Sequence, residues 1–108
     1  MDSNDKDFSV FLMASTLRAL WGEIYPSIVG IIIGYDNNTL KAIMYLDREP
    51  NDVDLDNLST ITAEICADFP SFINCEESCK RYGGGNFNEI YFSDFKNVES
   101  FVAYKRKL

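Results

Sequence analysis

The chain has 108 residues, of which 46% are hydrophobic and 14% aromatic, values typical of one folded domain and not of a disordered segment. Seventeen acidic residues against ten basic ones give a net charge of -7, which argues against a partner with a phosphate backbone or an anionic membrane surface. The chain contains no histidine, so the commonest general base and metal ligand are missing, and an enzyme is disfavoured.

The N-terminal half predicts one helix and a β-hairpin. Residues 1–7 are polar and are expected to fray. Residues 8–24 place large apolar side chains at mostly three- and four-residue steps, which predicts a helix that ends before Pro26. Residues 27–36 are rich in β-branched side chains, and Asn37 and Asn38 separate them from a second strand-like run, so a hairpin is predicted.

The C-terminal half predicts a second helix and two more strands. Asn51 is a good N-cap with Asp54 three residues later, and an apolar stripe then runs as far as Pro70. Residues 72–81 and 100–107 alternate as strands do, and the residues between them predict a long loop with a short extended piece at 89–92. The order αββαββ predicts a single α+β domain over residues 1–108, with an antiparallel four-stranded sheet and two helices packed on one face.

Cysteine usage and hydropathy predict a cytoplasmic protein without a metal or cofactor. Cys66, Cys75 and Cys79 are an odd number without a disulfide framework, and no apolar run approaches the ~18 residues of a membrane span. On one strand Cys75 and Cys79 would lie about 13 Å apart, and a fourth ligand is missing, so a zinc site is not predicted. An EF-hand calcium loop that started at Asp52 would need glycine at position 57 and glutamate at position 63, where the chain has Asn57 and Ala63, so a calcium loop is not predicted.

Negative charge is concentrated in the middle of the chain. Residues 47–77 hold nine carboxylates and one arginine, a net charge of -8. Positions 52, 56, 64 and 68 of the second helix are acidic and fall on an i,i+4 row, and no lysine or arginine lies between residues 51 and 69. Each like-charge pair costs about 0.2–0.5 kcal/mol, and Glu64 and Asp68 lie near the negative end of the helix dipole. The positive end of the helix dipole stabilises Asp52 but not Glu64 or Asp68, so helix stability alone does not explain this row, which predicts an acidic binding face.

Four segments carry a resemblance to a known family: LRALWGEIYPSIVGIIIGYD, IMYLDREPNDVDLD, AEICADFP and FVAYKRK. The chain resembles the small bacterial immunity proteins of contact-dependent growth inhibition and other polymorphic toxin systems. The match spans nearly the whole chain, although the GGGNFNEIYFSDF segment departs from the pattern. The resemblance implies a cytoplasmic antidote to the toxic domain of a cognate effector, a basic nuclease with an RNase or tRNase as the favoured kind.

Charge and resemblance together predict inhibition by occlusion of the toxin's nucleic-acid-binding or active-site surface. The predicted partner-binding residues are Asp47, Glu49, Asp52, Asp54, Asp56, Glu64, Asp68, Glu76 and Glu77, with Tyr82, Phe87 and Tyr91 as aromatic anchors. No catalytic residue is predicted, nor direct contact with nucleic acid or membrane, and the expected state is a monomer or weak dimer. The alternative is a small acidic adaptor or homodimeric module that pairs through an open strand edge and has no toxin partner.

Overall fold

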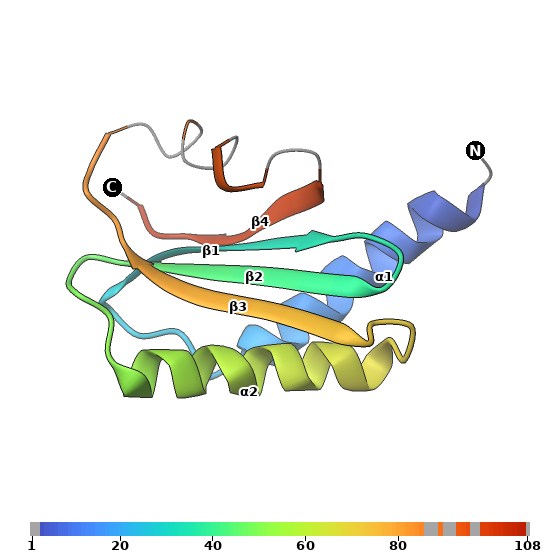
Figure 1. Ribbon diagram of the computed structural model, residues 1–108, viewed down its shortest axis with the longest axis horizontal. Helices are drawn as coiled ribbons and strands as arrows, with labels where there is room; N and C mark the ends of the chain where they lie inside the picture. The colour runs from blue at the N-terminus through green and yellow to red at the C-terminus, as the bar shows by residue number, and fades with distance from the viewer. Residues whose placement is uncertain (1–2, 86–88, 90–92, 96–97, 108) are drawn as a thin grey trace.

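The computed structural model describes residues 3–85, 89, 93–95 and 98–107 (Figure 1). The elements are α1 (Ser3–Leu20), β1 (Ile28–Tyr35), β2 (Thr39–Leu46), α2 (Asp52–Asp68), β3 (Asn74–Arg81) and β4 (Glu99–Lys105). The strands form one sheet in the order β3-β2-β1-β4, and both helices pack on the same face of it. The predicted α+β class and element order are therefore confirmed.

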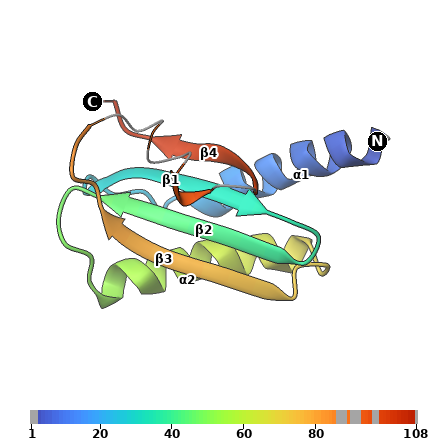
Figure 2. The same cartoon turned by 45° about the horizontal axis from the view of Figure 1, so that its top comes forward.

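The direction of β3 corrects the predicted sheet, because the sheet is mixed and not antiparallel throughout. β3 runs parallel to β2, with Thr39 opposite Asn74 and Leu46 opposite Arg81, whereas β1 pairs antiparallel with both β2 and β4. The reason is length, since the 17 residues of α2 and the eight residues of β2 each span about 26 Å. α2 thus returns the chain to the end of the sheet where β2 began, and β3 starts there in the same direction (Figures 1 and 2).

α1 differs from the predicted helix at both ends. It begins at Ser3, within the residues 1–7 that were expected to fray, and it ends at Leu20. Gly22 adopts a φ of +82°, and the Glu23 amide donates to the Leu20 carbonyl over 2.9 Å, which closes the helix with a glycine turn. The early end leaves Trp21 outside the helix and 85% exposed.

The main apolar core lies between the sheet and the two helices. It includes Leu12 of α1, Leu58 and Ile61 of α2, and Ile31 and Ile33 of β1, all fully buried. The first turns of α1 extend beyond the hairpin end of the sheet (Figures 1 and 2). α1 therefore joins the core from Phe8 onward, where the Phe8 ring contacts Tyr35 of β1 and the rings of Phe69 and Phe72 after α2.

A smaller core lies on the opposite face of the sheet, where part of the long connection after β3 docks. Phe95 is buried there among side chains of β1 and β2. The Asp94 carboxylate accepts a hydrogen bond from the Tyr45 hydroxyl (2.6 Å) and pairs with Lys80 (3.1 Å). Asp94 and Phe95 therefore anchor the predicted loop to the sheet. An extended piece was predicted at residues 89–92, and residues 90–92 lie outside the described residues.

Substitution of Gly34 by alanine is expected to destabilise the protein, because a Cβ at this position would lie 2.6 Å from Cδ1 of the buried Phe95 ring. The ring must move for the methyl group to fit, so we expect a loss of about 1–3 kcal/mol in the free energy of unfolding, measured by urea denaturation. Gly83→Ala is the matched control, since nothing lies within 4 Å of a Cβ there. Equal urea midpoints for the two variants would contradict the docking of Phe95 on β1.

Candidate partner-binding surface

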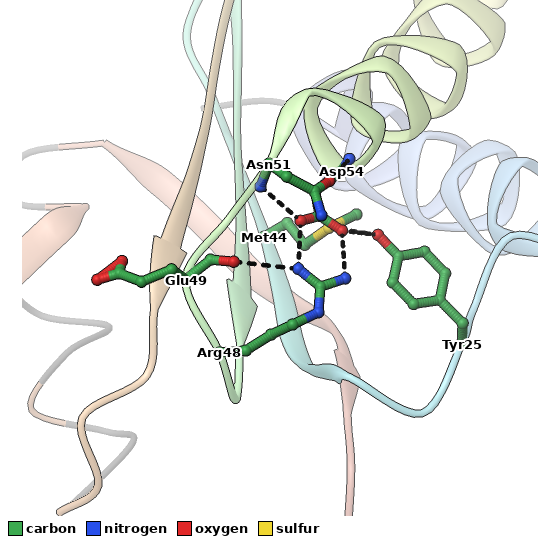
Figure 3. Close-up of polar contacts among 6 residues, drawn as sticks. All are labelled: Tyr25, Met44, Arg48, Glu49, Asn51 and Asp54. Carbon is green, nitrogen blue, oxygen red and sulfur yellow. Dashed lines mark hydrogen bonds and ion pairs between the residues drawn. The ribbon is translucent and has the colours of Figure 1, made fainter.

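Asp54, one of the predicted contact residues, is the buried centre of a polar cluster at the start of α2 (Figure 3). Arg48 binds its carboxylate through both terminal nitrogens, at 2.6 and 2.9 Å, and the Tyr25 hydroxyl donates to the same carboxylate. The Asn51 amide donates to Asp54 over 2.8 Å, and the Asn51 side chain accepts from the Asp54 amide, which confirms the predicted capping box. Asp54 is fully buried and therefore cannot contribute to a surface.

The same contacts explain the shifted pKa values in this cluster. The hydrogen bonds from Arg48 hold the pKa of Asp54 well below its usual value of 3.8, despite the opposing effect of burial. Burial and, as a smaller contribution, the hydrogen bond to Asp54 raise the pKa of Tyr25 to about 12. Glu49 follows Arg48 in the sequence, but its side chain points away from the cluster in Figure 3 and is exposed, so it remains available to a partner.

The acidic row of α2 does not lie on one face of the helix. Four residues turn an α-helix by about 400°, so the row drifts by about 40° at each step, and Asp52 and Asp68 point about 160° apart. Asp52 and Asp56 are exposed on the outward side of the helix. Asp68 faces α1, where it accepts hydrogen bonds from Ser15 (2.7 Å) and Arg18 (2.6 Å). The row therefore passes from the outward side of α2 to the contact with α1.

Glu64 lies at the edge where the two helices meet. Asn57 and Asp68 both contact α1, since the Asn57 side chain donates to the Glu23 carbonyl (3.0 Å) and Asp68 pairs with Arg18. Glu64 falls on the same helical stripe, seven residues after Asn57 and four before Asp68, and it is exposed. Among the described residues, neither Glu64 nor the outward Asp52 and Asp56 forms an ion pair.

The remaining predicted carboxylates are distributed over different parts of the molecule. Asp47 pairs with Arg106 over 2.8 Å. Glu76 and Glu77 are neighbours on β3 and therefore point to opposite faces of the sheet. Glu77 accepts hydrogen bonds from Ser59 and Thr62 beneath α2, whereas Glu76 is exposed. These residues do not form one continuous surface with the row on α2.

Of the three predicted aromatic anchors, the structure describes Tyr82 alone, and Tyr82 is not on the helical side of the molecule. Tyr82 is half-buried against the smaller core, and its hydroxyl donates to the Gly85 carbonyl. Phe87 and Tyr91 lie outside the described residues, so their role stays a prediction.

The exposed apolar side chains of α1 form a surface that the sequence reasoning missed. Val10, Ala14 and Leu17 follow one another at steps of four and three residues, on the side of α1 opposite the buried Leu12, and Trp21 follows in the turn directly after the helix; we call these four residues the α1 stripe. Leu17 is 63% exposed and Trp21 85%. The signal was present in the sequence, because α1 carries two apolar stripes half a turn apart and only one of them can face the sheet.

The α1 stripe and the outward carboxylates of α2 lie on the same side of the molecule, because both helices pack on one face of the sheet and both sets point away from it. We call this surface the helix-pair face. A shallow groove of about 660 Å³ borders it between the helices, lined by Phe11, Ala14, Ser15, Arg18, Asp68 and Phe69. Exposed apolar side chains next to unpaired charges are typical of a protein-binding domain.

Other kinds of site find no support in the part of the chain that the structure describes. It contains no group of three or more histidine, cysteine or acidic residues able to hold a metal ion. None of its helices is both long and apolar enough to span a membrane.

Comparisons with known proteins identify the family. The sequence model of the MafI2 immunity protein matches residues 9–102, and the chain therefore belongs to this immunity protein family. Membership confirms the coarser part of the resemblance, an immunity protein of a polymorphic toxin system, and implies a cognate toxin as partner. Proteins of this kind are generally non-enzymatic. The family match does not assign the chain to contact-dependent growth inhibition.

Two further similarities are weaker. A stretch of 78 residues is 27% identical to the vacuolar protein sorting-associated protein 41 homolog of Caenorhabditis briggsae, and covers 72% of this chain but only 8% of that protein. Two variants of the MamM CTD in zinc form are 12% and 10% identical, with TM-scores of 0.47 and 0.41. The two alignments cover 88% and 87% of this chain, and 99% and 98% of the respective MamM chains. Similarity at this level carries no functional argument.

Substitution Asp54→Asn is expected to lower the free energy of unfolding at pH 7 by about 1.5–3 kcal/mol, the range for hydrogen bonds to charged groups. Because the pKa of Asp54 is lowered on folding, its contribution is fully present above the ordinary pKa of 3.8 and is lost as pH falls through the lower folded-state value. The difference between wild type and variant should therefore be constant from pH 7 to 5 and shrink at pH 3. Urea denaturation at these three values measures it, and a difference that grows on acidification would contradict the assignment.

Proposed function

We propose that this protein neutralises its cognate toxin by covering the toxin's substrate-binding surface with the helix-pair face, and that the toxin is a basic nuclease acting in the cytoplasm. The observation that carries the proposal is the combination on one surface of the exposed α1 stripe with Asp52, Asp56 and Glu64, which carry no ion pair among the described residues. Membership of the immunity family supplies the class of partner.

Charge supports a basic partner. Three of the nine carboxylates between residues 47 and 77 are compensated, Asp47 by Arg106, Asp54 by Arg48 and Asp68 by Arg18. The negative charge that remains on the outward side of α2 is not compensated within the described residues. A nuclease must be positively charged where it holds phosphates, so this side attracts that surface and accelerates association.

The α1 stripe supports a long-lived complex. Aromatic side chains that become fully buried on binding contribute most of the energy of many interfaces, and a tryptophan is the side chain most enriched at such positions. Trp21 is the most exposed of the large apolar side chains in the described residues. Trp21 follows the end of α1 directly and precedes the glycine turn, whose Glu23 carbonyl accepts a hydrogen bond from Asn57 of α2.

The alternative is a homodimer or adaptor without a toxin, in which the α1 stripe or the strand edges of β3 and β4 pair with another copy. An apolar stripe with heptad-like spacing is compatible with self-association. The two functions differ in concentration dependence, because self-association increases with the concentration of this protein alone.

Co-expression with the toxic domain encoded beside the gene tests the class of function. We expect growth to be restored by the wild-type protein and the two proteins to co-purify as a complex in which the toxin no longer degrades its substrate. The complex should weaken as salt concentration rises, because exposed charges are screened. Growth inhibition that persists, with a protein that self-associates instead, would favour the adaptor.

Substitutions on the two halves of the helix-pair face should affect different rate constants. Asp56→Lys combined with Glu64→Lys should lower the association rate about tenfold at low salt, and less at high salt. Trp21→Ala should mainly accelerate dissociation and weaken binding by about 2 kcal/mol, which is about thirtyfold. Both are measured by surface plasmon resonance with the purified toxic domain.

Two controls match these variants. Glu99→Lys changes the charge at an exposed position of β4, and Val102→Ala removes apolar surface from a 41% exposed side chain on the same strand. Neither control lies on the helix-pair face, so each should leave the rate constants close to wild type. Equal effects of variants and controls would exclude this face as the interface while leaving the immunity function intact.

A further inference from the structure

Cys66 and Cys75 are brought together at the connection between α2 and β3. Cys66 lies in the last turn of α2 and Cys75 is the second residue of β3. Their sulfur atoms are 2.9 Å apart, and a disulfide bond is about 2.05 Å long, so a movement of less than about 1 Å would join them. The sequence predicted neither a disulfide framework nor a zinc site for these cysteines, and the structure leaves Cys75 exposed to solvent.

The backbone holds the two cysteines in this arrangement. The Phe69 amide donates to the Cys66 carbonyl over 3.2 Å and closes the end of α2. The Asn74 amide donates to the carbonyl of Asn38 in the hairpin, and Cys75 pairs with Leu40 in the parallel ladder. Both ends of the short connection are thus fixed, and the two sulfur atoms remain facing each other.

The two thiols differ in accessibility. Cys75 is exposed to solvent. Cys66 is half-buried, and this burial, with a smaller contribution from the hydrogen bond with Cys75, raises the pKa of Cys66 to about 12. Cys75 is therefore the thiol that a dissolved reagent meets first. Cys79 lies four residues further along β3, about 13 Å from Cys75, and cannot take the place of Cys66.

We propose that Cys66 and Cys75 form an oxidation site, which closes an intramolecular disulfide when the protein meets a small disulfide such as oxidised glutathione. The Cys75 thiolate attacks one sulfur of the reagent, whose S–S bond breaks and releases one glutathione thiolate. Cys66 loses its proton and attacks the Cys75 sulfur, which forms the protein disulfide and releases the second glutathione thiolate. The two protons lost by the cysteines convert both released thiolates to glutathione, so the protein is oxidised and the reagent reduced by two electrons.

The site does not depend on the proposed interface. It joins the C-terminal end of α2 to the edge strand β3, and Cys66 lies about 15 Å along the helix axis from Asp56. The disulfide restricts the unfolded chain, so the oxidised protein should resist urea better than the reduced protein.

The test is a thiol count on the purified full chain after incubation with oxidised glutathione at pH 8. We expect the number of free thiols to fall from three to one, the intact mass to fall by two hydrogen atoms, and dithiothreitol to reverse both changes. In Cys79→Ser the count should fall from two to none. A monomer on a non-reducing gel shows that the bond is intramolecular.

Peptide mapping must use cleavage at acidic residues. Trypsin leaves all three cysteines in one peptide, residues 49–80, because this segment has no internal lysine or arginine. Cleavage before Asp68 and after Glu76 and Glu77 separates the cysteines, so a Cys66–Cys75 bond appears as two linked peptides. The variant Cys66→Ser should instead retain one glutathione on Cys75. A wild-type protein that keeps three thiols, retains glutathione or links Cys79 would overturn the proposal.

Discussion

The ion pair between Arg48 and Asp54 is the interaction on which the arrangement of the helices depends. It joins the segment after β2 to the first turn of α2, while Tyr25 extends the cluster to the segment after α1. A buried carboxylate is unfavourable unless its hydrogen bonds are satisfied, and here Arg48, Tyr25 and the Asn51 amide satisfy it. Because one carboxylate also completes the capping box, the start of α2 and its position over the sheet are specified by the same group.

Once α2 begins at this point, its length determines the path of the chain into β3. The helix returns the chain to the hairpin end of the sheet, which makes β3 parallel to β2 and brings Cys75 opposite Cys66. The helix also brings Asp68 to Arg18 and Asn57 to the glycine turn after α1. Contacts at both ends of α2 hold the helix pair, so its outward carboxylates have a fixed position relative to the α1 stripe.

Local patterns predicted the elements of this fold well, because helix periodicity, the asparagine turn and the capping box act over a few residues. They did not predict the direction of β3, which requires the lengths of α2 and β2 to be compared. They predicted the capping role of Asp54 but not its pairing with Arg48, nor the pairing of Asp68 with Arg18, since a helix drawn alone omits charges on other elements. The i,i+4 row appeared as one face because the drift of about 40° per step was neglected. The α1 stripe was missed because the large apolar side chains of residues 8–24 were interpreted as one apolar face of a helix.

The positions of these carboxylates change the physical character of the proposed binding surface. A continuous row of four acidic residues would have implied an interface dominated by charge, whereas the helix-pair face combines three exposed carboxylates with the exposed apolar side chains of the α1 stripe. Exposed charges contribute mainly to the rate and selectivity of encounter, and they are screened by salt. Apolar and aromatic side chains that leave water on binding contribute mainly to the lifetime of the complex. An antidote needs both properties, because it must reach the toxin before the substrate does and must then remain bound. The division of these two properties between α2 and α1 is a physical reason for a small domain to leave a tryptophan exposed.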